Sequence, residues 1–144
     1  MKPMYTMTIL AIFCFTGKVT LNSLIDYAAF VAFFPQLMAG PIEKAIDLLP
    51  QIKDLKNPSR ADIKIGIALV SYGMFKKVLI GDTVGKYVDH IFCDPQYFAS
   101  DELIFAILMF GIQIYADFSG YSLIAQGSAR LFGIKLMDNF RTPY

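Results

Sequence analysis

The chain has 144 residues, of which 56% are hydrophobic and only 17% are charged, and its formal net charge at pH 7 is +1. Because about a quarter of the residues in soluble domains are charged, this composition indicates a membrane protein and excludes an ordinary soluble domain. The basic residues are dispersed along the chain, so the sequence gives no sign of a nucleic-acid-binding surface and no nucleic-acid partner is expected.

Two apolar stretches near the N-terminus, residues 4–17 and 24–40, are the first expected membrane segments. The first follows Lys2 and has the look of a signal peptide, but no A-x-A-like cleavage site comes after it, which favours a membrane segment. Both stretches are short against the roughly 20 residues that a spanning helix needs. Short spans are typical of a protein that lines a cavity.

The second stretch ends in a run that interrupts the helical backbone and contains Pro35, Gln36, Gly40 and Pro41. Each proline removes a backbone donor, and the carbonyl groups freed in this way are satisfied at membrane depth only inside protein or beside water. The run is therefore either a simple kink and helix end, or a broken or re-entrant segment that shapes a channel through the protein.

An amphipathic stretch, residues 41–64, is followed by the third expected membrane segment, residues 63–80. Apolar residues recur in the amphipathic stretch at three- and four-residue steps, which predicts helix in the membrane interface, and Pro50 is expected to divide it into two short helices. Lys76 and Lys77 lie near the far end of the third segment and are expected to be interfacial anchors rather than anion contacts.

Residues 81–102 are polar and acidic and are expected to form an outer loop, in which His90 is solvated. The amphipathic stretch is richer in Lys and Arg than this loop, so it is expected on the cytoplasmic side. The last apolar stretch, residues 103–129, would be about 40 Å long as one helix, against a hydrocarbon core of about 30 Å. It must therefore tilt, or break at Ser119 and Gly120.

These elements predict an all-α fold, a polytopic integral membrane helical bundle with broken or re-entrant segments and interfacial helices, organised as one transmembrane domain. Cys14 and Cys93 have no spacing motif, so neither a disulfide framework nor a metal site is predicted. Gly-rich phosphate loops, metal-ligand spacings and nucleophile elbows are absent from the sequence.

Asp117 is the most informative single residue, because it lies inside the longest apolar stretch. A charged residue in mid-span costs about 2.5 to 3.5 kcal/mol on insertion scales, and such residues usually face a protein interior or a water-filled cavity. Gln113, Asp117 and Tyr121 follow at four-residue steps and make a polar strip along one helical face, to which Ser119 adds a hydroxyl. The strip either holds helices together by hydrogen bonds or belongs to a substrate path.

Four stretches form a set with long motifs in register: FVAFFPQLMAGPIEKAIDLLPQI, YGMFKKVLIGDTVGKYVDHIF, IQIYADFSGYSLIAQGSARLFGI and NFRTPY. In this order and spacing they resemble the membrane-bound O-acyltransferase (MBOAT) family. The resemblance covers residues 22–144 and is greatest to the bacterial polysaccharide branch, which includes the alginate O-acetylases.

The resemblance implies a multi-pass enzyme of the bacterial cytoplasmic (inner) membrane, in contact with membrane lipid. Such an enzyme passes an acyl group, usually acetyl, from a thioester donor of the acetyl-CoA kind to a hydroxyl of a cell-surface polysaccharide or a carrier protein. The resemblance implies no bound cofactor or metal, and a periplasmic acyltransferase as a partner.

The resemblance assigns no catalytic residue to this chain. His90 matches neither histidine of the family pattern, and both of those histidines are expected beyond Tyr144, the last residue of the sequence. We therefore expect a central fragment that is inactive alone.

The resemblance also assigns expected roles to single residues. A channel would be shaped by Pro35, Gln36, Gly40 and Pro41, and polar groups along it would be supplied by Gln113, Asp117, Ser119 and Tyr121. Asn139 would position the segment that leads to the missing histidine. Two alternatives from other classes stay open: a small channel or transporter subunit with Asp117 in a permeation path, and a structural membrane adaptor.

Overall fold

The computed structural model describes residues 28–30, 32–33 and 45–140, and every regular element in these ranges is a helix. The elements are, in chain order, the α-helices α4 (Ala45–Lys53) and α5 (Arg60–Met74), the π-helix η1 (Phe75–Gly81), α6 (Asp82–Cys93), the 3-10 helix η2 (Pro95–Tyr97) and α7 (Ser100–Leu131). The all-α prediction is thus confirmed for the described part of the chain. The expected segment at residues 4–17 lies outside it, as does most of the segment at 24–40.

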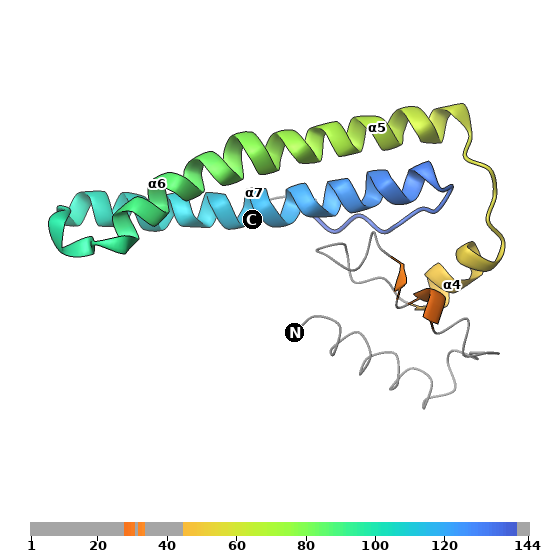
Figure 1. The fold of residues 1–144 in the computed structure, drawn as a ribbon, viewed down its shortest axis with the longest axis horizontal. Helices are drawn as coiled ribbons and strands as arrows, with labels where there is room; N and C mark the ends of the chain where they lie inside the picture. Colours follow the sequence, from red (N-terminus) through yellow and green to blue (C-terminus); the bar gives the residue numbers. More distant parts are fainter. Residues whose placement is uncertain (1–27, 31, 34–44, 141–144) are drawn as a thin grey trace.

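The main architectural feature is a long helical hairpin (Figure 1). Helices α5, η1 and α6 follow one another without a break and form one rod, which lies antiparallel along α7. A short turn that contains η2 joins the two arms. Ser59 begins the rod with a capping box, in which its hydroxyl accepts from the Asp62 amide while the Asp62 carboxylate accepts from the Ser59 amide.

Glycine allows the two arms of the hairpin to approach backbone to backbone. A Cβ placed on Gly73 would lie 2.7 Å from the carbonyl oxygen of Gly120, and one on Gly127 would lie 2.6 Å from the carbonyl oxygen of Gly66. Such distances leave no room for any side chain. Small residues at the contact are what membrane helices use to pack closely, so the rod and α7 are joined as a membrane helix pair would be.

The structure corrects the prediction of an outer loop at residues 81–102. Residues Asp82–Cys93 form helix α6, which buries Val88 and Ile91 against the other arm of the hairpin. The two are three residues apart and therefore share a helical face, a signal that the acidic composition concealed. His90 consequently lies in the last turn of α6, with its ring edge-on to Phe98, and not in a loop.

Helix α7 settles the alternative between a tilted and a broken helix at residues 103–129, because it continues unbroken through Ser119 and Gly120. Both residues are buried against the rod, where Gly120 meets Gly73 and the Ser119 hydroxyl receives a hydrogen bond from Lys76. At 1.5 Å per residue the helix is about 48 Å long. Within the described ranges it is the one helix that is long and apolar enough to cross a membrane.

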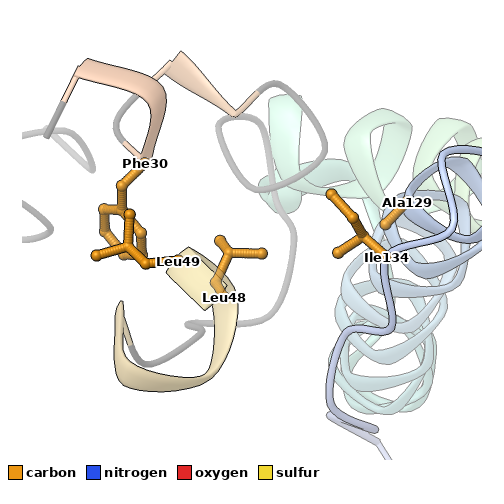
Figure 2. Packing of buried hydrophobic residues seen from close by; sticks show 5 residues of the cluster. All are labelled: Phe30, Leu48, Leu49, Ala129 and Ile134. Carbon is orange, nitrogen blue, oxygen red and sulfur yellow. The ribbon is translucent and has the colours of Figure 1, made fainter. Parts of the chain in front are cut away.

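A small apolar core joins helix α4 to the far end of α7. Figure 2 shows Leu48 and Leu49 of α4 beside Phe30, with Ala129 and Ile134 completing the cluster. The expected division of α4 at Pro50 is wrong, since Ala45–Lys53 is one helix that includes the proline. Proline removes its own donor and crowds the carbonyl four residues back, and the burial of two leucines in the same short helix offsets that cost.

After α7 the chain turns back at Gly133, whose φ of 77° lies in the left-handed region that suits glycine. Residues 134–140, which we call the strap, then run back along α7 toward its middle (Figure 1). The fold thereby brings the end of the described chain to the centre of the hairpin.

Candidate functional site

Asp117, near the midpoint of α7, has an opposite charge within reach. Its Oδ1 accepts a hydrogen bond from Lys77 Nζ at 3.0 Å, and the same ammonium is also paired with Asp82 at the start of α6. The Asp117 side chain is 26% exposed and the Lys77 side chain 21%, so both can be approached from outside the hairpin. The expectation that Lys77 is an interfacial anchor is therefore wrong, because its ammonium is held by carboxylates from both arms.

The π-helix places Lys77 and makes room for Asp117. Its wider turns are seen in the bond from the Asp82 amide to the Lys77 carbonyl, five residues back, and single π turns are frequent at functional sites. At the end of this segment, a Cβ on Gly81 would overlap the Oδ1 of Asp117. The absence of a side chain at Gly81 is thus what lets the carboxylate lie against the rod.

Lys76 makes a second polar contact on a different set of partners. Its Nζ lies 3.4 Å from the buried Ser119 hydroxyl, 4.9 Å from the ring centroid of Tyr72 and 5.2 Å from that of Tyr115. An ammonium over aromatic faces is attracted by the ring quadrupole. Among the described residues no carboxylate pairs with Lys76. The partners that the structure shows for its ammonium are two aromatic rings and one hydroxyl. This contact too differs from the expected interfacial anchor.

The predicted polar strip does face the other arm of the hairpin. The Tyr121 ring lies 5.5 Å below the Lys77 ammonium, so Asp117 and Tyr121 share one cation. Gln113 packs against Gly85, where a Cβ would come within 2.7 Å of its Nε2. The Oε1 of Gln113 is buried without a hydrogen-bond partner in the described part of the chain.

Asn139 is brought to the hairpin but not to Asp117. Its Nδ2 donates to the Ser122 hydroxyl at 3.3 Å, while Phe140 next to it packs edge-on against the Tyr115 ring at 6.2 Å. The strap therefore ends beside the contacts of Lys76.

Several residues of the sequence-based prediction lie outside the part of the chain that the structure describes. They include those expected to break the backbone and shape a channel: Pro35, Gln36, Gly40 and Pro41. Tyr144, beyond which the family's histidines are expected, lies outside the described residues as well. The channel-shaping roles and the position of the catalytic histidine therefore stay predictions.

Two features were not predicted from the sequence: the residues that the rod contributes to the site, and a second strip of polar side chains on α7. Lys77, Gly81 and Asp82 come from the stretch that was divided between a membrane segment and a loop. Ser122 and Gln126 are buried, and Gln126 Nε2 donates to the Met137 carbonyl. Their four-residue spacing places them on one helical face, and this signal was readable in the sequence.

Comparison with known proteins agrees with this picture of a membrane protein. The sequence model of the MBOAT, membrane-bound O-acyltransferase family, matches residues 10–144. The chain is 39% identical over 131 residues to a peptidoglycan O-acetyltransferase of Helicobacter pylori, which covers 90% of this chain and 25% of that protein. It is 38% identical over 123 residues to the probable alginate O-acetylase AlgI of Pseudomonas putida, covering 85% of this chain and 25% of that protein.

A more distant relative is a teichoic acid D-alanyltransferase of Bacillus subtilis, 29% identical over 119 residues, which cover 80% of this chain and 30% of that protein. No solved structure matches the chain. The chain thus spans about a quarter of the length of the O-acetyltransferase and O-acetylase relatives that it matches. Because the family's sequence model covers most of its residues, the chain belongs to the membrane-bound O-acyltransferase family.

Proposed function

We propose that this chain is part of an enzyme that transfers an acyl group, acetyl in particular, from a thioester donor to hydroxyl groups of a cell-surface polysaccharide. Membership of the acyltransferase family supports this, and so do relatives named for acetylation of peptidoglycan and alginate. The family and the apolar helix α7 support a membrane location, which we propose is the bacterial inner membrane, crossed several times. A periplasmic acyltransferase would act as partner, and a carrier protein is a second kind of acceptor.

The observation that carries the proposal is a cluster of polar groups halfway along a helix that can span a membrane. Asp117 is paired with Lys77 there, and Ser119 and Tyr121 lie close by. Charged groups at such a depth usually border an interior or a water-filled path. We propose that the cluster lines the acyl-transfer path, where it holds the polar parts of the substrates in place while the apolar surroundings exclude water from the thioester.

The Asp117 carboxylate is engaged by Lys77, and the proposal gives it no role as the proton acceptor for the sugar hydroxyl. Lys77 is a cation shared by two carboxylates, and His90 lies about 20 Å further along the rod axis at 1.5 Å per residue. Imidazole is the side chain suited to remove a hydroxyl proton at neutral pH. The proposal therefore assigns positioning to this part of the chain and leaves the base to another part of the complete enzyme.

The proposal is tested in membranes that contain the complete protein, with an acyl thioester as donor and a polysaccharide as acceptor. We expect Asp117→Asn to lower acyl transfer at least about tenfold with little change in protein amount, because the positioned ion pair is lost. Leu108→Ala is the control, since Leu108 is 63% exposed on the outer face of α7. Full transfer by Asp117→Asn would reject the role of the cluster. A wild-type protein that neither cleaves the thioester nor transfers the acyl group would reject the proposal that the chain belongs to an acyl-transferring enzyme.

A further inference from the structure

The strap, residues 134–140, is held at three points by side chains of α4 and α7. At its start, the Gln51 side chain of α4 makes two bonds to the backbone of Lys135, accepting from its amide at 2.9 Å and donating to its carbonyl at 3.2 Å. At its end, Asn139 donates to Ser122. Between these two points the strap meets one buried polar side chain of α7, Gln126.

Gln126 is placed to fix the strap's course. Its side chain is 8% exposed, and its Nε2 donates to the Met137 carbonyl at 2.7 Å and approaches Asp138 Oδ1 at 3.4 Å. Its neighbours along the same arm are small buried residues, Ala125, Gly127 and Ala129. A buried amide in such surroundings needs hydrogen-bond partners, and among the described residues the strap supplies those of its Nε2.

As the strap runs from Met137 to Phe140, its contacts move along α7 toward the N-terminus of that helix. Met137 meets Gln126, Asn139 meets Ser122, and Phe140 meets Tyr115, whose ring also lies under the Lys76 ammonium. An extended chain advances about 3.3 Å per residue, more than twice the rise of a helix, so a few strap residues cover several turns of α7. A displacement of the strap at Gln126 is therefore expected to shift Phe140 against Tyr115.

We infer that Gln126 is a positioning residue for acyl transfer. It holds the strap on α7 and thereby keeps Phe140 against Tyr115, beside the Lys76 ammonium. It touches no substrate in this role. The inference rests on the proposed acyl-transfer function and adds to it a residue from the second polar strip.

Kinetics of the complete protein separate a positioning role from a structural one. Gln126→Leu should lower kcat about tenfold per folded enzyme and leave the KM for the thioester within about twofold, because the donor site is kept and the geometry of reaction is lost. Gln96→Leu is the control, since Gln96 is exposed in η2 at the far turn of the hairpin. A Gln126→Leu protein that loses only abundance, or nothing, would overturn the inference.

Gln126→Glu gives a readout that packing alone would not move. A carboxylate cannot donate to the Met137 carbonyl, whereas the protonated acid can. The variant's kcat, relative to wild type at the same pH, should therefore rise as the pH is lowered. A constant ratio across the pH range would count against the hydrogen bond as the cause.

A cross-linking measurement keeps the inference testable even if acyl transfer is not found. In complete protein with Cys14 and Cys93 replaced by serine, the pair Ser122→Cys and Asn139→Cys should be joined by a short bis-methanethiosulfonate cross-linker, because these side chains are in contact. Adding Gln126→Leu should reduce the yield several-fold, whereas adding Gln96→Leu should not. Equal yields in all three proteins would show that Gln126 does not hold the strap.

Discussion

At the residue scale, Asp117 is tolerated in mid-helix because the Lys77 ammonium pairs with its carboxylate and because Gly81 leaves space for it. The carboxylate is bonded to Lys77, which Asp82 also binds, and it lies where Gly81 has no side chain. Partnered charges remove much of the cost of leaving water, although a buried ion pair adds little net stability over an apolar pair. The cluster is thus better explained by a function that needs polarity than by stabilisation of the hairpin.

Gly81→Ala tests the space for the carboxylate without touching a charge. The new Cβ would overlap Asp117 Oδ1, so the ion pair must shift, and we expect acyl transfer by the complete protein to fall at least about tenfold. Gly111→Ala is the matched control on α7, because no atom outside its own helix lies within 4 Å of that Cβ. It should leave transfer unchanged and gain about 0.5–1 kcal/mol of helix stability. Equal activity in both variants would show that the space at Gly81 has no role in acyl transfer.

Removal of Lys77 alone should be worse for stability than removal of the pair. Lys77→Met leaves Asp117 without its cation, and we expect a loss of about 1–3 kcal/mol, reduced from the figure for a fully buried pair by partial exposure. The double variant Lys77→Met with Asp117→Asn should recover most of that loss in thermal unfolding in detergent, yet keep the lowered acyl transfer expected of Asp117→Asn. Recovery of activity together with stability would mean that the pair is only structural.

At the element scale, the sequence predicted α7 well because its apolar run is long and its polar residues keep a four-residue spacing. The prediction failed for α6, because the charged residues Asp82, Lys86 and Asp89 suggested a loop. The helix is held by a buried face that consists of Val88 and Ile91. The pairing of the rod with α7 was also beyond sequence pattern. It depends on glycines that meet across the hairpin, and which glycine meets which is decided only by packing.

Gly127→Ala tests the close approach of the two arms. Its Cβ would lie 2.6 Å from the Gly66 carbonyl oxygen, and a backbone group cannot turn aside as a flexible side chain can. The arms must separate, with an expected cost of about 1–3 kcal/mol in thermal unfolding in detergent. The Gly111→Ala protein again serves as control, and unchanged unfolding of Gly127→Ala would refute the packing described here.

Ser59→Ala tests the capping box at the start of α5, outside the expected membrane segment. Loss of the hydroxyl should cost about 1 kcal/mol and increase amide hydrogen exchange in the first turn of the helix. Bonds from the Ser59 hydroxyl and amide hold the pKa of Asp62 below its ordinary value of 3.8. The carboxylate's contribution is therefore complete above that value and is lost as the pH falls through the lowered pKa, so the difference between wild type and variant should shrink there to the part that comes from the Asp62 amide bond to the Ser59 hydroxyl. A difference that does not shrink there would contradict this assignment.

At the scale of the whole molecule, the hairpin is apolar outside and polar at its centre. Large side chains such as Ile104, Ile107 and Leu108 are more than 60% exposed on α7, while Asp117 and Lys77 face each other between the arms. The composition and motifs were sufficient to predict a membrane protein of the acyltransferase family. They could not show which cation meets Asp117, because that depends on the π-helix within the rod.

The most direct test of the central claim is thiol labelling in the complete protein with Cys14 and Cys93 replaced by serine. A cysteine introduced by Tyr121→Cys, beside Lys77, should react with a water-soluble maleimide and be protected by the acyl thioester donor, because the polar centre borders the transfer path. A cysteine introduced by Leu108→Cys, on the outer face, should stay unreactive in lipid. If position 121 is as unreactive as position 108, or reacts equally with and without the donor, the centre of the hairpin is not part of an acyl-transfer path.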